Sequence, residues 1–237
     1  MKVYIHLVFC TKHLRYLCKM NTFALYMQIM EYPILMADII KSRKGNSKEI
    51  LLDFKKLVGF INLKWAKSIV SPLTITLGDE FQGVIKTSQN AFQIMIAMEE
   101  EIIKNNYAIK LRYVLHVGEI ETQINRNSAY EMLGEGLTTA RKSLNELKKS
   151  KSRFLVSSNK KSESFDIVND LFKLLESFID SWKSKEYVIV SMFLLNKSYQ
   201  EIAENLNMNI SSSWRRKKSL NIEEYTLCKK LILKINA

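Results

Sequence analysis

The sequence contains few of the residues that interrupt regular structure, with 7 glycines and 2 prolines in 237 residues. Disordered linkers are usually rich in these residues, so we expect few linkers here. Cysteine is also scarce, and Cys10, Cys18 and Cys228 form an odd, widely spaced set. This set argues against a disulfide framework and indicates a reducing compartment. We therefore expect the protein to be cytoplasmic.

An unbroken apolar segment is missing from the first 29 residues, whose apolar runs are interrupted by Lys12, His13 and Arg15. A transmembrane helix needs about 20 mostly apolar residues in a row, so we expect no transmembrane segment there. Basic residues also recur after the apolar part, which does not fit a signal peptide. We expect residues 1–29 to be a poorly ordered extension or the product of a mis-set start codon, with the folded part beginning at Met30.

Acidic residues are outnumbered, because 24 Asp and Glu stand against 36 Lys and Arg and give a net charge of +12. Such an excess suits a polyanionic partner. The positive charge is spread along the whole chain, however, and a general coding bias towards Lys would produce the same composition. Charge alone therefore does not decide the partner.

The hydrophobic pattern of residues 30–160 alternates between strands and helices. Strands are predicted at residues 32–40, 73–77, 82–86, 110–122 and 153–157, and helices at 47–65, 88–104 and 133–149. The order β-α-β-β-α-β, followed by α-β, is that of the split βαβ or ferredoxin-like arrangement. We therefore predict an α+β domain with an antiparallel sheet and helices on one face.

Acidic residues stand at the ends of two predicted strands. Asp38 closes the first strand, and Asp79 and Glu80 lie at the tip of the predicted hairpin. If the sheet brings them together, their oxygens could hold Mg²⁺, which prefers oxygen ligands and often shares them with phosphates. The alternative is that each Asp only forms a turn at a strand end, which is a common use of this residue.

Residues 161–237 are predicted to form a separate, all-helical domain, and residues 198–219 have the pattern of a helix-turn-helix. Ala203 allows close helix packing, Asn207 tolerates the left-handed conformation of a tight turn, and the second helix would begin near Ser211. Hydroxyls and basic groups on this helix would reach DNA. The expected DNA contacts are Ser211, Ser212, Ser213, Arg215, Arg216, Lys217 and Lys218. Serine at position 213 departs from the pattern, which has an apolar residue there, and a helical hairpin that binds protein or simply packs is the alternative.

Four segments resemble, in order, the sequence blocks of class III nucleotidyl cyclases. They are Asp38, residues 77–81 (Leu-Gly-Asp-Glu-Phe), residues 111–120 (Leu-Arg-Tyr-Val-Leu-His-Val-Gly-Glu-Ile) and residues 133–141 (Leu-Gly-Glu-Gly-Leu-Thr-Thr-Ala-Arg). With the C-terminal helix-turn-helix pattern, the chain is similar to the SatD family of bacterial proteins over about residues 31–237. The resemblance implies a nucleotidyl cyclase-like domain followed by a small helix-turn-helix domain.

The resemblance also implies ligands and site residues. In the cyclases, two aspartates bind metal ions that hold a triphosphate, and Asp38 and Asp79 match them, with Glu80 beside Asp79. The implied nucleotide contacts are Ile39, Ile40, Lys41, Arg43, Gly78 and Glu135. The expected ligands are thus Mg²⁺ and a nucleoside triphosphate or related nucleotide. A homodimer is implied as well, because many cyclases build their site across a dimer.

The match with the cyclases fails at two positions. The cyclase pattern has an Asn and an Arg, four residues apart, on the helix that follows the glycine-containing turn; here these positions are Thr138 and Lys142. Thr is a weak substitute for Asn, and Lys cannot make the planar two-pronged contact of Arg with phosphate. Thr138 and Lys142 are therefore weak candidates for catalytic residues, and the resemblance supports nucleotide binding more strongly than catalysis.

These patterns together predict a DNA-binding regulatory protein with a nucleotide- and Mg²⁺-binding, cyclase-like sensor domain. Two alternatives remain open. The first is an active nucleotidyl cyclase or nucleotide synthase that is regulated by its helix-turn-helix domain. The second is a non-catalytic scaffold that binds other proteins.

Overall fold

The computed structural model describes residues 30–40 and 47–235. One compact unit spans Glu31–Ala237. The extension predicted at residues 1–29 lies outside the described residues, as do Lys41 and Arg43, two of the expected nucleotide contacts.

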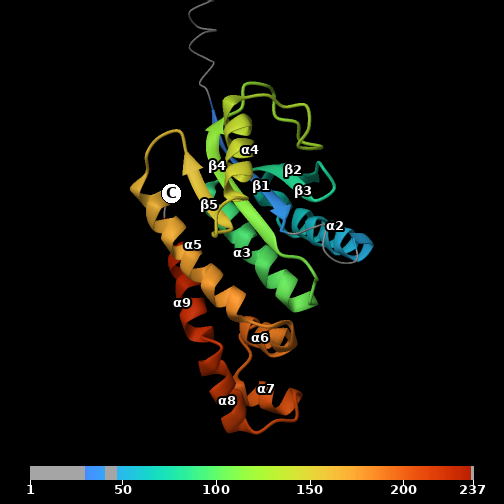
Figure 1. The fold of residues 1–237 in the computed structure, drawn as a ribbon, viewed down its shortest axis with the longest axis vertical. Helices are drawn as coiled ribbons and strands as arrows, with labels where there is room; N and C mark the ends of the chain where they lie inside the picture. Colours follow the sequence, from blue (N-terminus) through green and yellow to red (C-terminus); the bar gives the residue numbers. More distant parts are fainter. Residues whose placement is uncertain (1–29, 41–46, 236–237) are drawn as a thin grey trace, which may run out of the picture. The chain divides into compact units, whose positions relative to one another are not determined.

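A five-stranded sheet with the order β2-β3-β1-β4-β5 forms the centre of this unit (Figure 1). Its strands are β1 (Glu31–Ile39), β2 (Ile69–Ile75), β3 (Glu80–Ile85), β4 (Leu111–Glu119) and β5 (Phe154–Ser158). The pairs β1–β3, β1–β4 and β2–β3 are antiparallel, as the ferredoxin-like pattern predicts. The pair β4–β5 is parallel, because the helix between these strands carries the chain back to the starting edge of β4.

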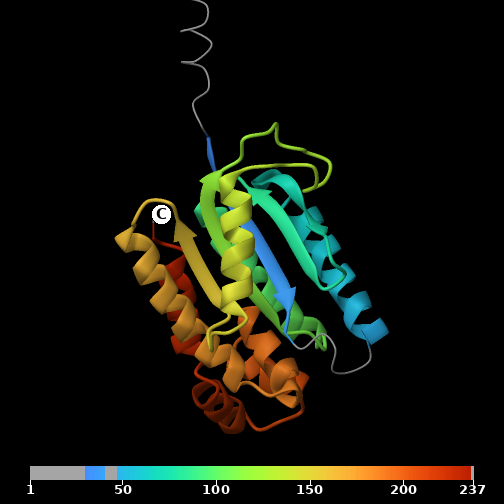
Figure 2. The same ribbon diagram turned by 45° about the horizontal axis from the view of Figure 1, so that its top comes forward.

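The two faces of the sheet are covered by different helices (Figure 2). Helices α2 (Ser47–Lys64) and α3 (Ser88–Asn105) pack on one face, and α4 (Glu135–Leu147) packs on the other. The expectation that the helices lie on one face thus holds for α2 and α3 but is wrong for α4. The physical reason lies in β1, where Leu35 points to one face and Ile34 and Met36 to the other, so both faces need apolar cover.

The C-terminal part is helical, as predicted, but it does not have a core of its own. It comprises α5 (Glu163–Ser181), α6 (Tyr187–Leu194), α7 (Tyr199–Asn205), α8 (Ile210–Ser219) and α9 (Ile222–Ile232), besides the short 3-10 helix Ser184–Glu186. Phe172 of α5 stacks on Phe154 of β5 at 5.0 Å and meets Phe92 of α3 edge-on at 5.8 Å. One core therefore runs through the sheet and the C-terminal helices, and the boundary predicted after residue 160 does not separate two cores.

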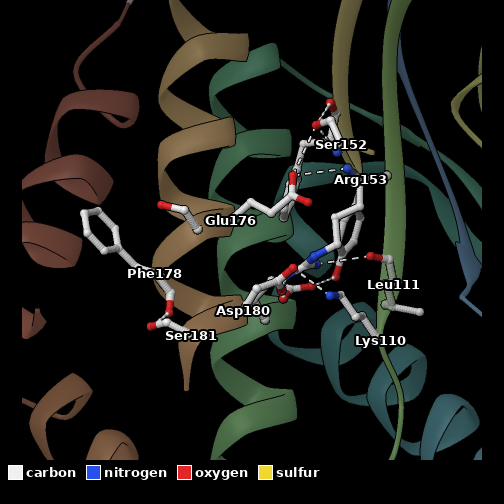
Figure 3. A network of polar contacts seen from close by, with 12 residues as sticks. Lys110, Leu111, Ser152, Arg153, Glu176, Phe178, Asp180 and Ser181 are labelled. Carbon is white, nitrogen blue, oxygen red and sulfur yellow. Dashed lines mark hydrogen bonds and ion pairs between the residues drawn. The ribbon is translucent and has the colours of Figure 1, made fainter. Parts of the chain in front are cut away.

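A buried polar network reinforces this connection (Figure 3). Arg153, which is 3% exposed, lies at the start of β5 and donates to Glu99 of α3 at 2.8 Å and to Asp180 of α5 at 3.1 Å. Both of these bonds come from Nη2, and Nη1 donates to the carbonyl of Leu111 at 3.1 Å. One side chain thus ties β4, α3 and α5 together beneath the edge of the sheet.

No helix among the described residues is long and apolar enough to cross a membrane.

Candidate functional site

The end of β1 brings together two of the predicted site residues. Asp38 pairs with Glu80 on β3 and with Arg112 on β4, so all three stand side by side across the sheet. Since alternate residues of a strand share a face, they point to the same side as Ile34 and Met36, which is the side that α4 covers. The sequence-based expectation that the first strand and the hairpin bring their carboxylates together is therefore correct for Asp38 and Glu80.

Three cations surround these two carboxylates. Arg112 Nη1 lies 2.9 Å from both Oδ1 and Oδ2 of Asp38. Lys148, at the end of α4, places its Nζ 3.0 Å from Glu80 Oε1 and 3.4 Å from Asp38 Oδ2. Arg141, in the middle of α4, donates to Glu80 Oε2. We call Asp38, Glu80, Arg112, Arg141 and Lys148 the charge cluster.

The carboxylates of the charge cluster are more deeply buried than two of its cations. The side chains of Asp38 and Glu80 are 6% and 7% exposed, against 31% for Arg141 and 39% for Lys148. Burial raises the pKa of Asp38, and the positive charges of Arg112 and Lys148 offset only part of this effect. Burial also lowers the pKa of Lys148, but its hydrogen bond to Glu80 and the charges of Glu80 and Asp38 outweigh that effect and raise it. The two exposed cations thus form the rim of a site with an acidic floor.

This arrangement fits a magnesium ion poorly. Both oxygens of Asp38 already contact Arg112, and those of Glu80 contact Arg141 and Lys148. Among the described residues, no group of three or more His, Cys, Asp or Glu side chains could hold a metal ion. A magnesium ion at Asp38 would compete with Arg112 and Lys148 for the carboxylate oxygens, so the donor set favours an anion at the rim over a cation at the floor.

The other residues predicted for nucleotide binding are not part of the charge cluster. The amide of Ile39 donates to the carbonyl of Asp79 at 2.9 Å, and that of Ile40 donates to Lys110 at 2.8 Å. Because these amides complete the sheet, they are not available to bind phosphates as the resemblance implied. Gly78 lies in the exposed turn of the β2–β3 hairpin with a φ of 82°, which explains why glycine stands there.

Helix α4 presents different residues to the site from those that the sequence suggested. Thr138 and Lys142 are exposed, and the Thr138 hydroxyl donates to Gly134 within its own helix at 3.4 Å. Glu135 lies in the first turn of α4, at the end of the helix opposite Lys148. The helix therefore reaches the charge cluster through Arg141 and Lys148.

Arg112, Arg141 and Lys148 are the site residues that reading the sequence missed. Two signals were available for them. Arg112 is in phase with Val114 and His116 along a strand, which places it on the same face, and Arg141 and Lys148 are seven residues apart, which places them on one side of a helix. Neither signal says which carboxylate they meet, because that depends on strand register.

The pair of helices predicted to bind DNA is formed by α7 and α8. Ser198 caps α7 by accepting from the amide of Glu201 at 3.1 Å, and Asn209 caps α8 by accepting from the amide of Ser211 at 3.1 Å. Asn207 lies in the turn between them with a φ of 49°, which confirms the left-handed conformation expected from the sequence. Ala203 is buried, as close packing of two helices requires.

Most of the basic residues of α8 have acidic partners. Arg216 donates to Glu186 at 2.6 Å, Lys217 lies 3.0 Å from Glu223, and Lys218 also pairs with Glu223. Arg215 has no carboxylate partner among the described residues and is exposed. Ser213 is fully buried, so it cannot reach DNA as predicted.

Comparison with known proteins assigns the chain to a family. The SatD family model matches residues 32–235, which is most of the chain. The chain belongs to the SatD family. This confirms the resemblance inferred from the sequence. No curated protein matches the chain.

Solved structures similar to this SatD-family chain include two cyclases. A bacterial light-regulated adenylyl cyclase is 13% identical with a TM-score of 0.41, and the match covers 54% of this chain and 43% of that one. The guanylyl cyclase Cya2 is 13% identical with a TM-score of 0.34, and the match covers 49% of this chain and 70% of that one.

Proposed function

We propose that this SatD-family protein is a regulatory protein that binds a nucleotide through its phosphates at the charge cluster. The observation that carries the proposal is the convergence of Arg112, Arg141 and Lys148 on the same end of the sheet. Three cations and two carboxylates give the charge cluster itself a net charge of +1. A polyphosphate would therefore be attracted to the rim of the cluster.

The geometry supports phosphates as the anionic group. Arg141 carries a planar guanidinium and Lys148 a compact ammonium, and these two groups bind phosphate oxygens with charge-assisted hydrogen bonds. Both are partly exposed, so each can turn from Glu80 towards a ligand without crossing the core. Asp38 and Glu80 then hold the cations in place between binding events.

A titration with nucleotides tests this proposal. The full chain is titrated with ATP and GTP, with inorganic triphosphate as a ligand without a base, and both binding heat and unfolding temperature are measured. Each of Arg141→Gln and Lys148→Gln removes one charge-assisted contact, so each should weaken binding about tenfold. Lys142→Gln is the matched control, because Lys142 neighbours Arg141 but is exposed and outside the cluster. If no nucleotide binds, or if the control weakens binding equally, the proposal is wrong.

Magnesium is tested in the same titration. An affinity for ATP that does not change with Mg²⁺ would support direct binding by the cations. An affinity that requires Mg²⁺ and is lost in Asp38→Asn would assign the ion to Asp38, as the cyclase resemblance implied. Mass spectrometry of the same mixtures reports any new nucleotide species, which would make the protein an enzyme.

A second candidate function, DNA binding by α7 and α8, is favoured by one observation. Arg215 is exposed on α8, on the same side of the helix as Lys218 and Ser211, which are also exposed. The first turn of this helix is capped by Asn209. Basic and hydroxyl groups in this position suit contacts with a DNA backbone.

Binding of a labelled DNA duplex at several salt concentrations tests this candidate. Arg215→Ala should weaken binding at all concentrations and reduce the slope of log affinity against log salt by about 1. Arg216→Ala is the control, because Arg216 already pairs with Glu186, and it should have a smaller effect. An affinity that Arg215→Ala leaves unchanged would exclude α8 as the DNA contact.

A further inference from the structure

A groove follows α9 where this helix faces the end of α6, and none of the functions proposed above uses it. Two hollows of about 350 and 470 Å³ make up the groove, and both are lined by Phe193, Asn196, Thr226 and Lys230. Ligand sites typically measure about 300–1,000 Å³. Each hollow is therefore large enough for a small molecule.

Lysines dominate the charged lining of the groove. Lys217 and Lys229 are paired with glutamates at 3.0 and 2.6 Å. Lys197, Lys230 and Lys234 also line it, and within the described part of the chain none of these three has a carboxylate partner. The groove thus gathers positive charge that the surrounding fold does not neutralise, and this charge complements an anion.

The remaining lining offers apolar surface and neutral donors. Phe193 and Ile222 form a buried floor, and Leu227 stands 58% exposed at one side. Ser198 also lines one hollow, where it caps α7 by accepting from the amide of Glu201. Asn196 follows the C-cap of α6 with a φ of 60° and lines both hollows. Apolar surface beside cations and neutral donors suits an amphiphilic anion better than a bare inorganic one.

We infer that this groove binds a small organic anion that combines one acidic group, such as a carboxylate or phosphate, with an apolar body. The acidic group contacts Lys197 and Lys230, and the apolar body covers Leu227 and Phe193. The groove also borders Lys217 of α8 and its partner Glu223 at the start of α9. The inference is independent of the nucleotide site, because no residue of the charge cluster lines the groove.

Displacement of a fluorescent probe tests the groove in the full chain. Anilinonaphthalene sulfonate, an amphiphilic anion, serves as the probe, and phenylbutyrate, acetate and the neutral phenylbutanamide serve as competitors. We expect phenylbutyrate to displace the probe, because it has both the charge and the apolar body. Acetate and phenylbutanamide each lack one of these and should displace it at least about tenfold more weakly. Equal displacement by acetate, or by the neutral amide, would overturn the inference.

Variants locate the binding. Lys230→Glu and Lys197→Glu should each weaken the probe about tenfold, because repulsion replaces attraction. Thr226→Trp should do the same by filling both hollows without changing the charge. Lys173→Glu is the control, because it makes the same charge change on an exposed position of α5 outside the groove. If the control weakens the probe as much as Lys230→Glu does, or if Thr226→Trp leaves it unchanged, binding is not in the groove.

Discussion

Burial disfavours the ionised form of Asp38, and its cationic neighbours favour it. The side chain is 6% exposed, and burial is the largest influence on its pKa, which is raised despite Arg112 and Lys148. A buried carboxylate of this kind costs stability unless its partners compensate fully. Residues of binding sites often carry such a cost in stability, because their role is to bind a ligand and not to stabilise the fold.

The sign of the effect on stability follows from the raised pKa. The folded protein binds the Asp38 proton more tightly than the unfolded chain, in which the pKa of Asp is about 3.9. The protonated Asp38 side chain therefore contributes to the free energy of unfolding. This contribution is fully present below the pKa of the unfolded chain and is lost as the pH rises through the raised pKa of the folded protein. We expect Asp38→Asn to unfold at the same or a higher temperature than the wild type at pH 7, and the difference between the two proteins to shrink towards pH 3.

Thermal unfolding of both proteins across this pH range checks the expectation. Asp170→Asn, an exposed position on α5, is the control for the loss of one negative charge. A clear loss of stability at pH 7 in Asp38→Asn, absent from the control, would show that the ion pairs of Asp38 outweigh its burial.

His116 shows what the sequence could tell at this scale. A lone His inside a strand, with no partner apparent in the sequence, is predicted to be structural, and His116 is indeed 1% exposed, with its Nδ1 3.0 Å from Ser157 Oγ. The ion pairs of Asp38 could not be foreseen in the same way. Arg112 stands 74 residues from Asp38 in the chain, and their meeting depends on the register of two strands, which one sequence does not specify.

At the scale of elements, the contact between α4 and β4 positions the two rim cations. A Cβ atom on Gly136 would lie 2.7 Å from the carbonyl carbon of Gly118, and one on Gly118 would lie 2.8 Å from the Cα of Gly136. Only a residue without a side chain lets α4 approach the strand so closely. The approach brings Arg141 and Lys148 within reach of Glu80.

Gly136→Ala tests this contact. The new methyl group meets backbone atoms that cannot rotate away, so we expect a loss of about 1–3 kcal/mol in the free energy of unfolding. Gly59→Ala is the control, because a Cβ on Gly59 of α2 would meet nothing within 4 Å. That change should raise stability by about 0.5–1 kcal/mol, since alanine is the better helix former. Urea unfolding measures both, and equal effects would show that α4 has room to shift.

The elements themselves were largely predictable. The period of the apolar residues gives β1, α3 and β4 close to their observed bounds, because these segments bury continuous stripes. The face that α4 occupies was not predictable in the same way. The sequence shows that α4 is amphipathic, but not which side of a sheet it joins, and that choice depends on β1 being apolar on both faces.

At the scale of the whole molecule, the sheet and the C-terminal helices fold on one core. A boundary between two domains is predicted after residue 160, where the segment is polar, but only a short loop joins β5 to α5, which lies along it (Figure 1). Arg153 links this edge to Glu99 and Asp180, and Trp182 donates to the carbonyl of Leu220 at 2.8 Å. A polar connection in sequence is thus only the loop between a strand and a helix of the same core.

This continuity means that residues 30–160 should not fold alone. Removing the rest of the chain takes away the buried face of α5, which consists of Phe165, Val168, Phe172, Leu175 and Ile179. Burying such a side chain stabilises a protein by about 1.5–3 kcal/mol. Five of them together match the free energy of unfolding of a typical protein, about 5–15 kcal/mol. We therefore expect the fragment to lack a cooperative thermal transition, whereas residues 30–237 unfold in a single step.

Circular dichroism and NMR of the two proteins distinguish this outcome from two independent domains. The fragment should retain some secondary structure but show poorly dispersed amide signals, because the packing of Phe92 and Phe154 depends on Phe172. Adding residues 161–237 as a separate chain should restore the dispersion, which controls for damage from truncation itself. A sharp transition in the fragment alone would show that the sheet is a domain in its own right. In that case a nucleotide at the charge cluster could act on the C-terminal helices only across a domain boundary, and not through a shared core.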